Sequence, residues 1–295
     1  MTEMNMIESL NSALDNMLEV HDNVVIFGED VGYFGGVFRV TDGLQEKHGA
    51  HRVFDAPLAE GGIAAIAFGM GLNGLRPVAE IQFADYIFPA YDQIVNEIAK
   101  LRHRSGGEFS TPLTIRTPAG GGIKGGHHHS QSPESQFTHT PGLKVVYCSN
   151  PNNAKGLLTS AIECNDPVIF FEPKRCYRGP FYGDPHNVPT WKGHAKADVP
   201  EGHYSIPLEQ AEVVMEGDAC TVIAWGAMVH VAEQGIKDSG INAELIDLQT
   251  LLPWDRDTVV NSVKKTGRCV IVHEAPKTSG FGAEMSASIQ ERCFW

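Results

Sequence analysis

The sequence predicts an α/β protein with two domains, each built on a parallel β-sheet covered by helices. Short runs that are apolar throughout alternate with amphipathic helical patterns, which is typical of strands buried on both faces of a parallel sheet. The chain has 295 residues. At about 100–200 residues per domain, this length suggests two domains. A stretch rich in proline and glycine separates two such alternating regions, so we expect the domain boundary there.

The first region, residues 1–178, begins with a helix and continues as an α/β alternation. Residues 5–20 carry apolar side chains at helical spacing, and 23–30 have the pattern of a buried strand. Further helices are expected near 61–75, 86–104 and from Pro151 onwards. Further strands are expected at 76–83, 112–118, 143–149 and 167–173.

The second region follows a connection predicted at residues 179–204. Six of the 17 prolines lie in the segment from Pro173 to Pro207 inclusive, which suits an interdomain segment. The second domain is expected over 205–295, with strands at 220–226, 242–248 and 269–274 and helices near 227–239, 255–264 and 280–292. The sequence stops after the last helix without a closing strand, so we expect this domain to be incomplete.

Composition and charge narrow the classes of function. The chain has 23 Lys and Arg against 36 Asp and Glu, a net charge of −13, which disfavours binding to nucleic acid or an anionic membrane. Its six cysteines form no CxxC pair and no zinc-type spacing, which favours a reducing compartment. The N-terminus lacks signal-peptide and transit-peptide features. We therefore expect the cytoplasm of a bacterium, or the mitochondrial matrix for a mature eukaryotic chain.

Two features carry ionisable groups at expected element ends. The loop at 119–134 holds five glycines and three consecutive histidines directly after a strand. One histidine could act as an acid or base near pH 7, the three could bind a metal incidentally, or the loop could be a solvated surface. Glu60 precedes Gly61 and Gly62 at the start of an apolar helix, where the helix dipole alone would favour a carboxylate.

Several segments together resemble a known family. Residues 58–107, HSQSPE at 129–134, and residues 142–158 and 166–174 closely resemble the β subunit of the thiamine-diphosphate-dependent decarboxylase component of 2-oxo acid dehydrogenase complexes. The segments ADYIFPAYDQIVNE, HSQSPE and HEAPKTSGFGAEM resemble the branched-chain enzyme more than the pyruvate enzyme. The resemblance implies a transketolase-like pyrimidine-binding domain followed by a smaller transketolase C-terminal-like domain.

The resemblance also implies an activity. With an α subunit, in an α2β2 heterotetramer, the chain would decarboxylate branched-chain 2-oxo acids oxidatively, as a 3-methyl-2-oxobutanoate dehydrogenase in branched-chain amino acid catabolism. The acyl group would pass to the lipoyl arm of an acyltransferase component. A pyruvate or acetoin dehydrogenase β subunit is the alternative within the family. A non-catalytic assembly subunit is the alternative from another class, and the presence of both Glu60 and His129 counts against it.

The same resemblance assigns site residues. Glu60 matches the carboxyl that hydrogen-bonds to the pyrimidine nitrogen N1′ of the cofactor, and an apolar setting from Leu58 and Ala59 would favour its protonated form. His129 matches the catalytic histidine, the acid for acyl transfer, with Ser130 as a possible neighbour. Leu58, Gln82 and Tyr86 match positions that line the cofactor pocket, although Tyr86 could also be a core residue.

Metal sites are implied as well. The diphosphate and Mg²⁺ would be held by the α subunit, so thiamine diphosphate would be shared between the two chains. Gly217-Asp218-Ala219 only partly matches the Gly-Asp-Gly signature for Mg²⁺, and we expect a turn there. Gly69 to Gly74 match GxGxxG but end a helix, which favours helix packing over nucleotide binding. A structural K⁺ is implied by similarity at six positions: Thr111, Leu113, Thr114, Ala161, Cys164 and Asp166.

Overall fold

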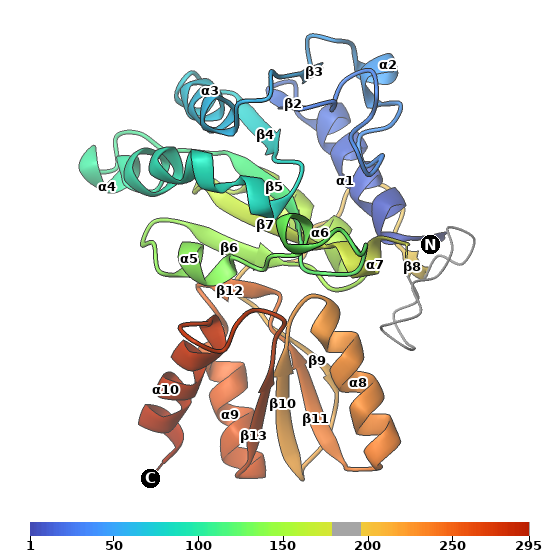
Figure 1. The fold of residues 1–295 in the computed structure, drawn as a ribbon, viewed down its shortest axis with the longest axis vertical. Helices are drawn as coiled ribbons and strands as arrows, with labels where there is room; N and C mark the ends of the chain where they lie inside the picture. Colours follow the sequence, from blue (N-terminus) through green and yellow to red (C-terminus); the bar gives the residue numbers. More distant parts are fainter. Residues whose placement is uncertain (179–195, 295) are drawn as a thin grey trace.

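A computed structural model describes residues 1–178 and 196–294, so most of the predicted connection at 179–204 lies outside the described residues. Figure 1 shows two α/β units, one above the other. The helices are α1 (Met6–Val20), α2 (Leu44–His48), α3 (Glu60–Leu72), α4 (Leu101–Arg104), α5 (Glu134–Thr138), α6 (Pro151–Glu163), α7 (Lys174–Arg178), α8 (Ala227–Ser239), α9 (Arg256–Thr266) and α10 (Phe281–Cys293). The strands are β1 (Thr2–Met4), β2 (Val24–Gly28), β3 (Val53–Asp55), β4 (Arg76–Glu80), β5 (Thr114–Ala119), β6 (Lys144–Tyr147), β7 (Val168–Pro173), β8 (Ala197–Val199), β9 (Glu212–Met215), β10 (Cys220–Ala224), β11 (Ala243–Asp247), β12 (Thr250–Leu252) and β13 (Cys269–Val272).

The larger sheet has the strand order β12-β6-β7-β5-β4-β2-β3, and all of its pairings are parallel except that of β12 with β6. Side chains along each strand alternate between its two faces. Phe27 packs in a core with Ile63 of α3, whereas its neighbour Ile26 packs in a second core with Leu14 of α1 and Leu157 of α6. The predicted parallel sheet covered on both faces is confirmed.

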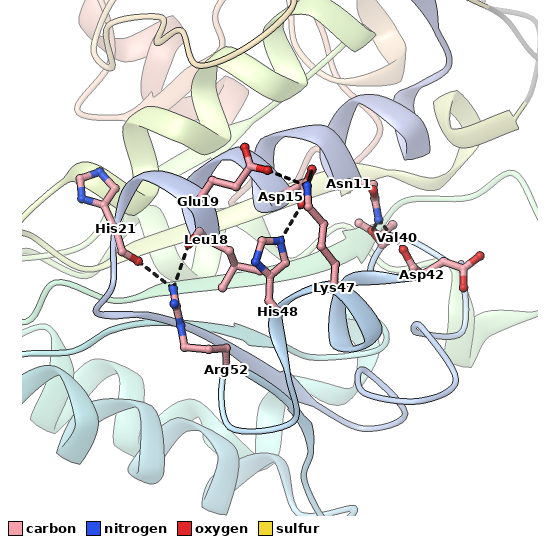
Figure 2. A network of polar contacts seen from close by, with 10 residues as sticks. All are labelled: Asn11, Asp15, Leu18, Glu19, His21, Val40, Asp42, Lys47, His48 and Arg52. Atoms are coloured by element: carbon pink, nitrogen blue, oxygen red, sulfur yellow. Dashed lines mark hydrogen bonds and ion pairs between the residues drawn. The ribbon is translucent and has the colours of Figure 1, made fainter.

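A polar network attaches α1 to α2. The helix begins with a capping box in which Asn5 accepts from the Glu8 amide and Glu8 accepts from the Asn5 amide. Figure 2 shows Asp15 of α1 bound by Lys47 and His48, at 2.7 and 2.6 Å. Burial alone would raise the pKa of Asp15, but these two partners together hold it below its usual value. The contacts fix α2 against α1.

The smaller sheet has the order β13-β10-β11-β9, with β9 antiparallel to β11. After β11 the chain crosses back, and β12 pairs with β6 at the edge of the larger sheet. One apolar core extends across both units, because Trp225, Ile246 and Phe281 belong to the same cluster as Phe27. The second unit is therefore packed firmly onto the first, and β12 of the expected second domain completes the first sheet.

The prediction of a single helix over 86–104 is wrong. The chain forms 3₁₀ turns at Ala84–Tyr86 and Phe88–Ala90, a π-helix at Gln93–Ile98, and then α4. Pro89 lacks the N–H that would continue an α-helical ladder at this point. The predicted apolar face survives the break, because Ile87, Ile94 and Ile98 are fully buried. The irregular backbone places Tyr86 and its neighbours at the carboxyl edge of the larger sheet.

Candidate active site

Glu60 is the first residue of α3, close to the carboxyl end of β2. No side chain caps the start of α3, so the positive end of the helix dipole is available to the Glu60 carboxylate. A Cβ added to Gly61 would lie 3.1 Å from the Pro89 carbonyl oxygen, which shows how closely the helix start packs on the segment after Tyr86. A glycine at this position therefore brings Glu60 beside the 84–90 segment.

An acidic cluster lies at the same sheet edge. Glu29 follows β2 directly and is buried, and its Oε1 has no hydrogen-bond partner among the described residues. Burial raises the pKa of Glu29, and the negative charge of Glu60 adds to this effect. Gln82 Nε2 lies 3.4 Å from the Glu29 carbonyl oxygen and 3.2 Å from Asp30 Oδ2. The structure thus brings the predicted residues Glu60 and Gln82 to one place, around Glu29.

Three contacts orient the imidazole of His129. Its Nδ1 lies 3.0 Å from the Gly125 carbonyl oxygen, and its Nε2 lies 2.8 Å from Tyr86 Oη. A carbonyl can only accept, so Nδ1 carries the proton and Nε2 of the neutral ring accepts from the tyrosine hydroxyl. The edge-on ring of Phe83 lies 4.5 Å away between centroids. Tyr86 is therefore a partner of His129 and not merely a core residue.

The other two histidines of the loop, and the apolar residues beside Glu60, are exposed, whereas His129 is half-buried. His127 and His128 are exposed, and their rings contact each other with centroids 3.8 Å apart and planes tilted by 44°. Leu58 is 80% exposed and Ala59 is exposed too, so this chain by itself does not form the apolar setting that we expected around Glu60. The expectation assumed that nearby apolar residues would fold over the carboxyl, whereas they face outward at the helix start.

A large cavity of about 1300 Å³ lies between the two units, on the other side of the histidine loop. Ser130, Trp254 and Phe281 line it, whereas Glu60, Gln82 and Tyr86 do not.

Two of the segments that carry the six predicted potassium positions lie side by side, but these positions suit a cation only in part. The Val168 amide donates to the Leu113 carbonyl at 3.0 Å, which joins the two segments that carry them. Thr114 Oγ1 is buried without a partner among the described residues, as an unfilled ligand would be. However, Arg76 already donates to the Cys164 carbonyl at 3.0 Å, and Asp166 pairs with Arg102. Two of the expected ligands are thus engaged by arginines.

Sequence reasoning missed three residues around His129. They are Phe83, Asp85 and Lys174. Asp85 has only 9% of its surface exposed and Lys174 only 3%. The available signal was a charged residue within the otherwise apolar segment FADYIF, since buried charges are rare without a specific partner.

Two negative findings hold for residues 1–178 and 196–294. Within these ranges, no helix is both long enough and apolar enough to cross a membrane. No group of three or more His, Cys, Asp or Glu side chains in the same ranges could hold a metal ion.

Comparison with known proteins identifies the class that this fold and site define. Residues 2–180 match the transketolase pyrimidine-binding domain and residues 209–295 match the transketolase C-terminal domain. A solved structure titled as a split-gene transketolase, an inactive β4 tetramer, has a TM-score of 0.74 at 20% identity and covers 98% of this chain and 84% of that one. The transketolase-like fold class is confirmed.

The similar curated proteins narrow this class. The chain is 57% identical to the 2-oxoisovalerate dehydrogenase subunit beta of Pseudomonas aeruginosa, over 99% of this chain and 84% of the relative. It is 56% identical to the mitochondrial counterpart of Dictyostelium discoideum, over 99% and 76%. It is 46% identical to a pyruvate dehydrogenase E1 component subunit beta of Acholeplasma laidlawii, over 98% and 85%. The chain belongs to the family of β subunits of thiamine-diphosphate-dependent 2-oxo acid dehydrogenases.

Proposed function

We propose that this chain is the β subunit of a branched-chain 2-oxo acid dehydrogenase and supplies the proton-transferring groups of its active site. The observation that carries the site assignment is the fixed imidazole of His129, held at one nitrogen by Tyr86 and at the other by Gly125. The identity of 57% to a 2-oxoisovalerate dehydrogenase subunit, against 46% to a pyruvate dehydrogenase subunit, supports the branched-chain substrate.

The residues at the start of α3 fit one end of thiamine diphosphate. Bound thiamine diphosphate supplies a carbon nucleophile for the 2-oxo group and takes up the electron pair released when CO2 leaves. The Glu60 carboxyl makes no hydrogen bond or ion pair within residues 1–178 and 196–294, so it is available to exchange a proton with the pyrimidine N1′. Leu58, exposed beside it, would pack on the pyrimidine ring. Gln82 and Tyr86 would complete this side of the pocket.

His129 would act in the transfer to the lipoyl arm. When the disulfide of the dithiolane breaks, one sulfur bonds to the acyl carbon and the other takes a proton. Protonated His129 would donate that proton from Nε2 once the sulfur takes the place of Tyr86 Oη, which lies 2.8 Å from this nitrogen and holds the ring until then. Ser130 follows His129 directly and is half-buried, but its hydroxyl donates to the Gly126 carbonyl at 2.7 Å. Ser130 therefore shapes the loop and does not touch the imidazole.

The chain needs an α subunit to complete this site. A β subunit of this family implies an α partner. We propose an α2β2 assembly in which the α subunit holds the diphosphate and Mg²⁺ and covers the exposed Leu58. Tyr33 is 92% exposed in the loop after β2, and Phe34 beside it is 53% exposed, so the same edge offers further apolar surface to the partner. The acyltransferase component is the proposed second partner.

The domain limits and the potassium site are part of the same proposal. Residues 1–178 would be the pyrimidine-binding domain and 205–295 the C-terminal domain, with β12 added to the first sheet. The Thr114 hydroxyl, which has no hydrogen-bond partner among the described residues, favours K⁺ at the six named positions, whereas the arginine contact to the Cys164 carbonyl opposes it. Melting of the assembled enzyme in KCl and in NaCl tests the ion, since bound K⁺ would raise the melting temperature selectively. A bacterial cytoplasm or a mitochondrial matrix suits the chain, as its relatives come from both sources.

Release of CO2 tests the substrate assignment. Enzyme assembled with α subunit should release CO2 from 3-methyl-2-oxobutanoate with a kcat/KM at least tenfold above that for pyruvate. Preference for pyruvate would favour the alternative within the family. No release from either substrate by an assembled, cofactor-loaded enzyme would favour a non-catalytic subunit.

A further inference from the structure

The histidine loop is held by a buried carboxylate that the proposed chemistry does not use. Asp85 has 9% of its surface exposed, and its Oδ1 lies 3.2 Å from the backbone nitrogens of both Ser130 and Gln131. These two amides directly follow His129. One oxygen atom therefore accepts from two consecutive N–H groups and fixes the backbone on the C-terminal side of the imidazole.

We propose that Asp85 is a positioning residue for His129, an inference that rests on the proposed role of His129 in acyl transfer. The 3₁₀ turn Ala84–Tyr86 makes both contacts, since Asp85 binds the loop backbone and the adjacent Tyr86 binds the ring. One short 3₁₀ turn thus fixes both the orientation of the imidazole and the position of the backbone next to it. A displacement of about 1 Å in such a group can cost on the order of 100-fold in rate.

The loop needs such an anchor because its own sequence is permissive. Five glycines precede the histidines, and glycine loses much conformational freedom when a loop is ordered. Within the loop, the Gly120 amide donates to the Gln131 carbonyl at 2.9 Å, which closes its base. A charged acceptor binds amides more strongly than a neutral one, so the aspartate suits this task better than an amide or hydroxyl.

A buried lysine supports the charge of Asp85. Lys174 Nζ lies 5.6 Å from the centre of the Phe83 ring, and the same ring also contacts His129. Burial lowers the pKa of Lys174 to about 8, and the negative charge of Asp85 opposes this fall. Asp85 Oδ2 has no hydrogen-bond partner among the described residues, so the lysine acts through its charge and not through a bond. Phe83 thus contacts the His129 ring, Asp85 holds the backbone that follows it, and Lys174 lies over the Phe83 ring.

Two variants of the assembled, cofactor-loaded enzyme test the proposal. Asp85→Ala should slow acylation of a lipoyl domain on the order of 10–100-fold, while CO2 release with an artificial electron acceptor changes less than about threefold. Asp85→Asn keeps one acceptor oxygen and should recover part of the rate. Asp257→Ala, which removes an exposed carboxylate of α9, is the matched control and should change neither half-reaction.

The double variant separates positioning from general damage. Asp85→Ala combined with His129→Ala should be no slower than His129→Ala alone, because Asp85 acts through the histidine. Hydrogen exchange of the peptide 119–134 should speed up in Asp85→Ala at an unchanged melting temperature. An additive loss, an equal loss in both half-reactions, or unchanged exchange would overturn the proposal. Normal acylation by His129→Ala would instead remove the proposed function of the histidine, and the exchange result would still decide whether Asp85 holds the loop.

Discussion

Tyr86 Oη lies 2.8 Å from His129 Nε2, and the two residues come from separate segments that meet at the carboxyl edge of the larger sheet. Tyr86 belongs to a 3₁₀ turn after β4, and His129 ends a short 3₁₀ turn in the glycine-rich loop after β5. Because β4 and β5 are parallel neighbours, the segments that follow them leave the sheet side by side. The pairing of adjacent parallel strands thus creates the contact.

Tyr86→Phe removes one hydroxyl and leaves the ring. One hydrogen bond contributes about 1 kcal/mol, so acylation of the lipoyl domain should fall roughly three- to tenfold. Tyr91→Phe is the control, since its hydroxyl makes only a 3.4 Å contact with the Gln136 carbonyl. Equal acylation rates for the Tyr86 variant and the native enzyme would show that the contact does not orient the histidine.

His129→Ala should separate the two half-reactions. Cofactor binding should persist, and CO2 release measured with an artificial acceptor should fall much less than lipoyl acylation. The physical reason is that, in the proposed mechanism, the proton of the histidine goes to the dithiolane sulfur and not to the decarboxylation step. His128→Ala, which changes the exposed neighbour, should behave like the native enzyme. Losses of similar size in both half-reactions would contradict the assignment.

Glu134 should make stability depend on pH. The residue is 1% exposed, Trp225 Nε1 donates to its Oε1 at 3.2 Å, and burial raises its pKa to about 7. The folded state then binds a proton that the unfolded state releases near pH 4.5, so the free energy of unfolding falls as pH rises from about 4.5 through 7. The loss at pH 8 is at most on the order of 3 kcal/mol.

Glu134→Gln keeps the acceptor for Trp225 and removes the titration. Its melting temperature relative to the native assembly should therefore be higher at pH 8 than at pH 5. Asp247, whose pKa burial also raises to about 7, remains in both proteins and cancels in this comparison. Parallel melting curves for the two proteins across this pH range would show that Glu134 does not titrate there.

The isolated chain should bind thiamine diphosphate and Mg²⁺ weakly, because in the proposed assembly it holds only one side of the cofactor. Calorimetry should detect no micromolar binding by the chain alone, and added α subunit should create both binding and decarboxylation. Micromolar affinity without the α subunit would mean that this chain contains a complete site.

The regular elements follow closely from local pattern. Helix α1 and the apolar strands β2, β5, β7 and β10 were predictable because their side-chain spacing reports burial directly. The broken segment 84–104 was not, since its apolar spacing is helical while Pro89 interrupts the backbone. Strand β12 could not be predicted either, because only its pairing with β6 distinguishes its three residues from a loop.

Some site residues could be predicted from the sequence and others could not. Glu60 and His129 could be named from the motifs that contain them. Asp85 could not, because its role depends on two backbone amides 45 and 46 residues away in sequence. The exposure of Leu58 could not be predicted either, since the sequence alone does not distinguish an exposed apolar residue from a core residue.

The most direct measurement is the rate of CO2 release from 3-methyl-2-oxobutanoate by Glu60→Gln enzyme assembled with α subunit. Glutamine keeps the size of the side chain but cannot exchange the proton, so the rate should fall roughly 10²–10⁴-fold while assembly and melting temperature stay unchanged. Glu46→Gln, an exposed change on α2, should retain the native rate. A Glu60→Gln enzyme that retains more than a tenth of the native rate would contradict the central claim that this carboxyl moves the proton.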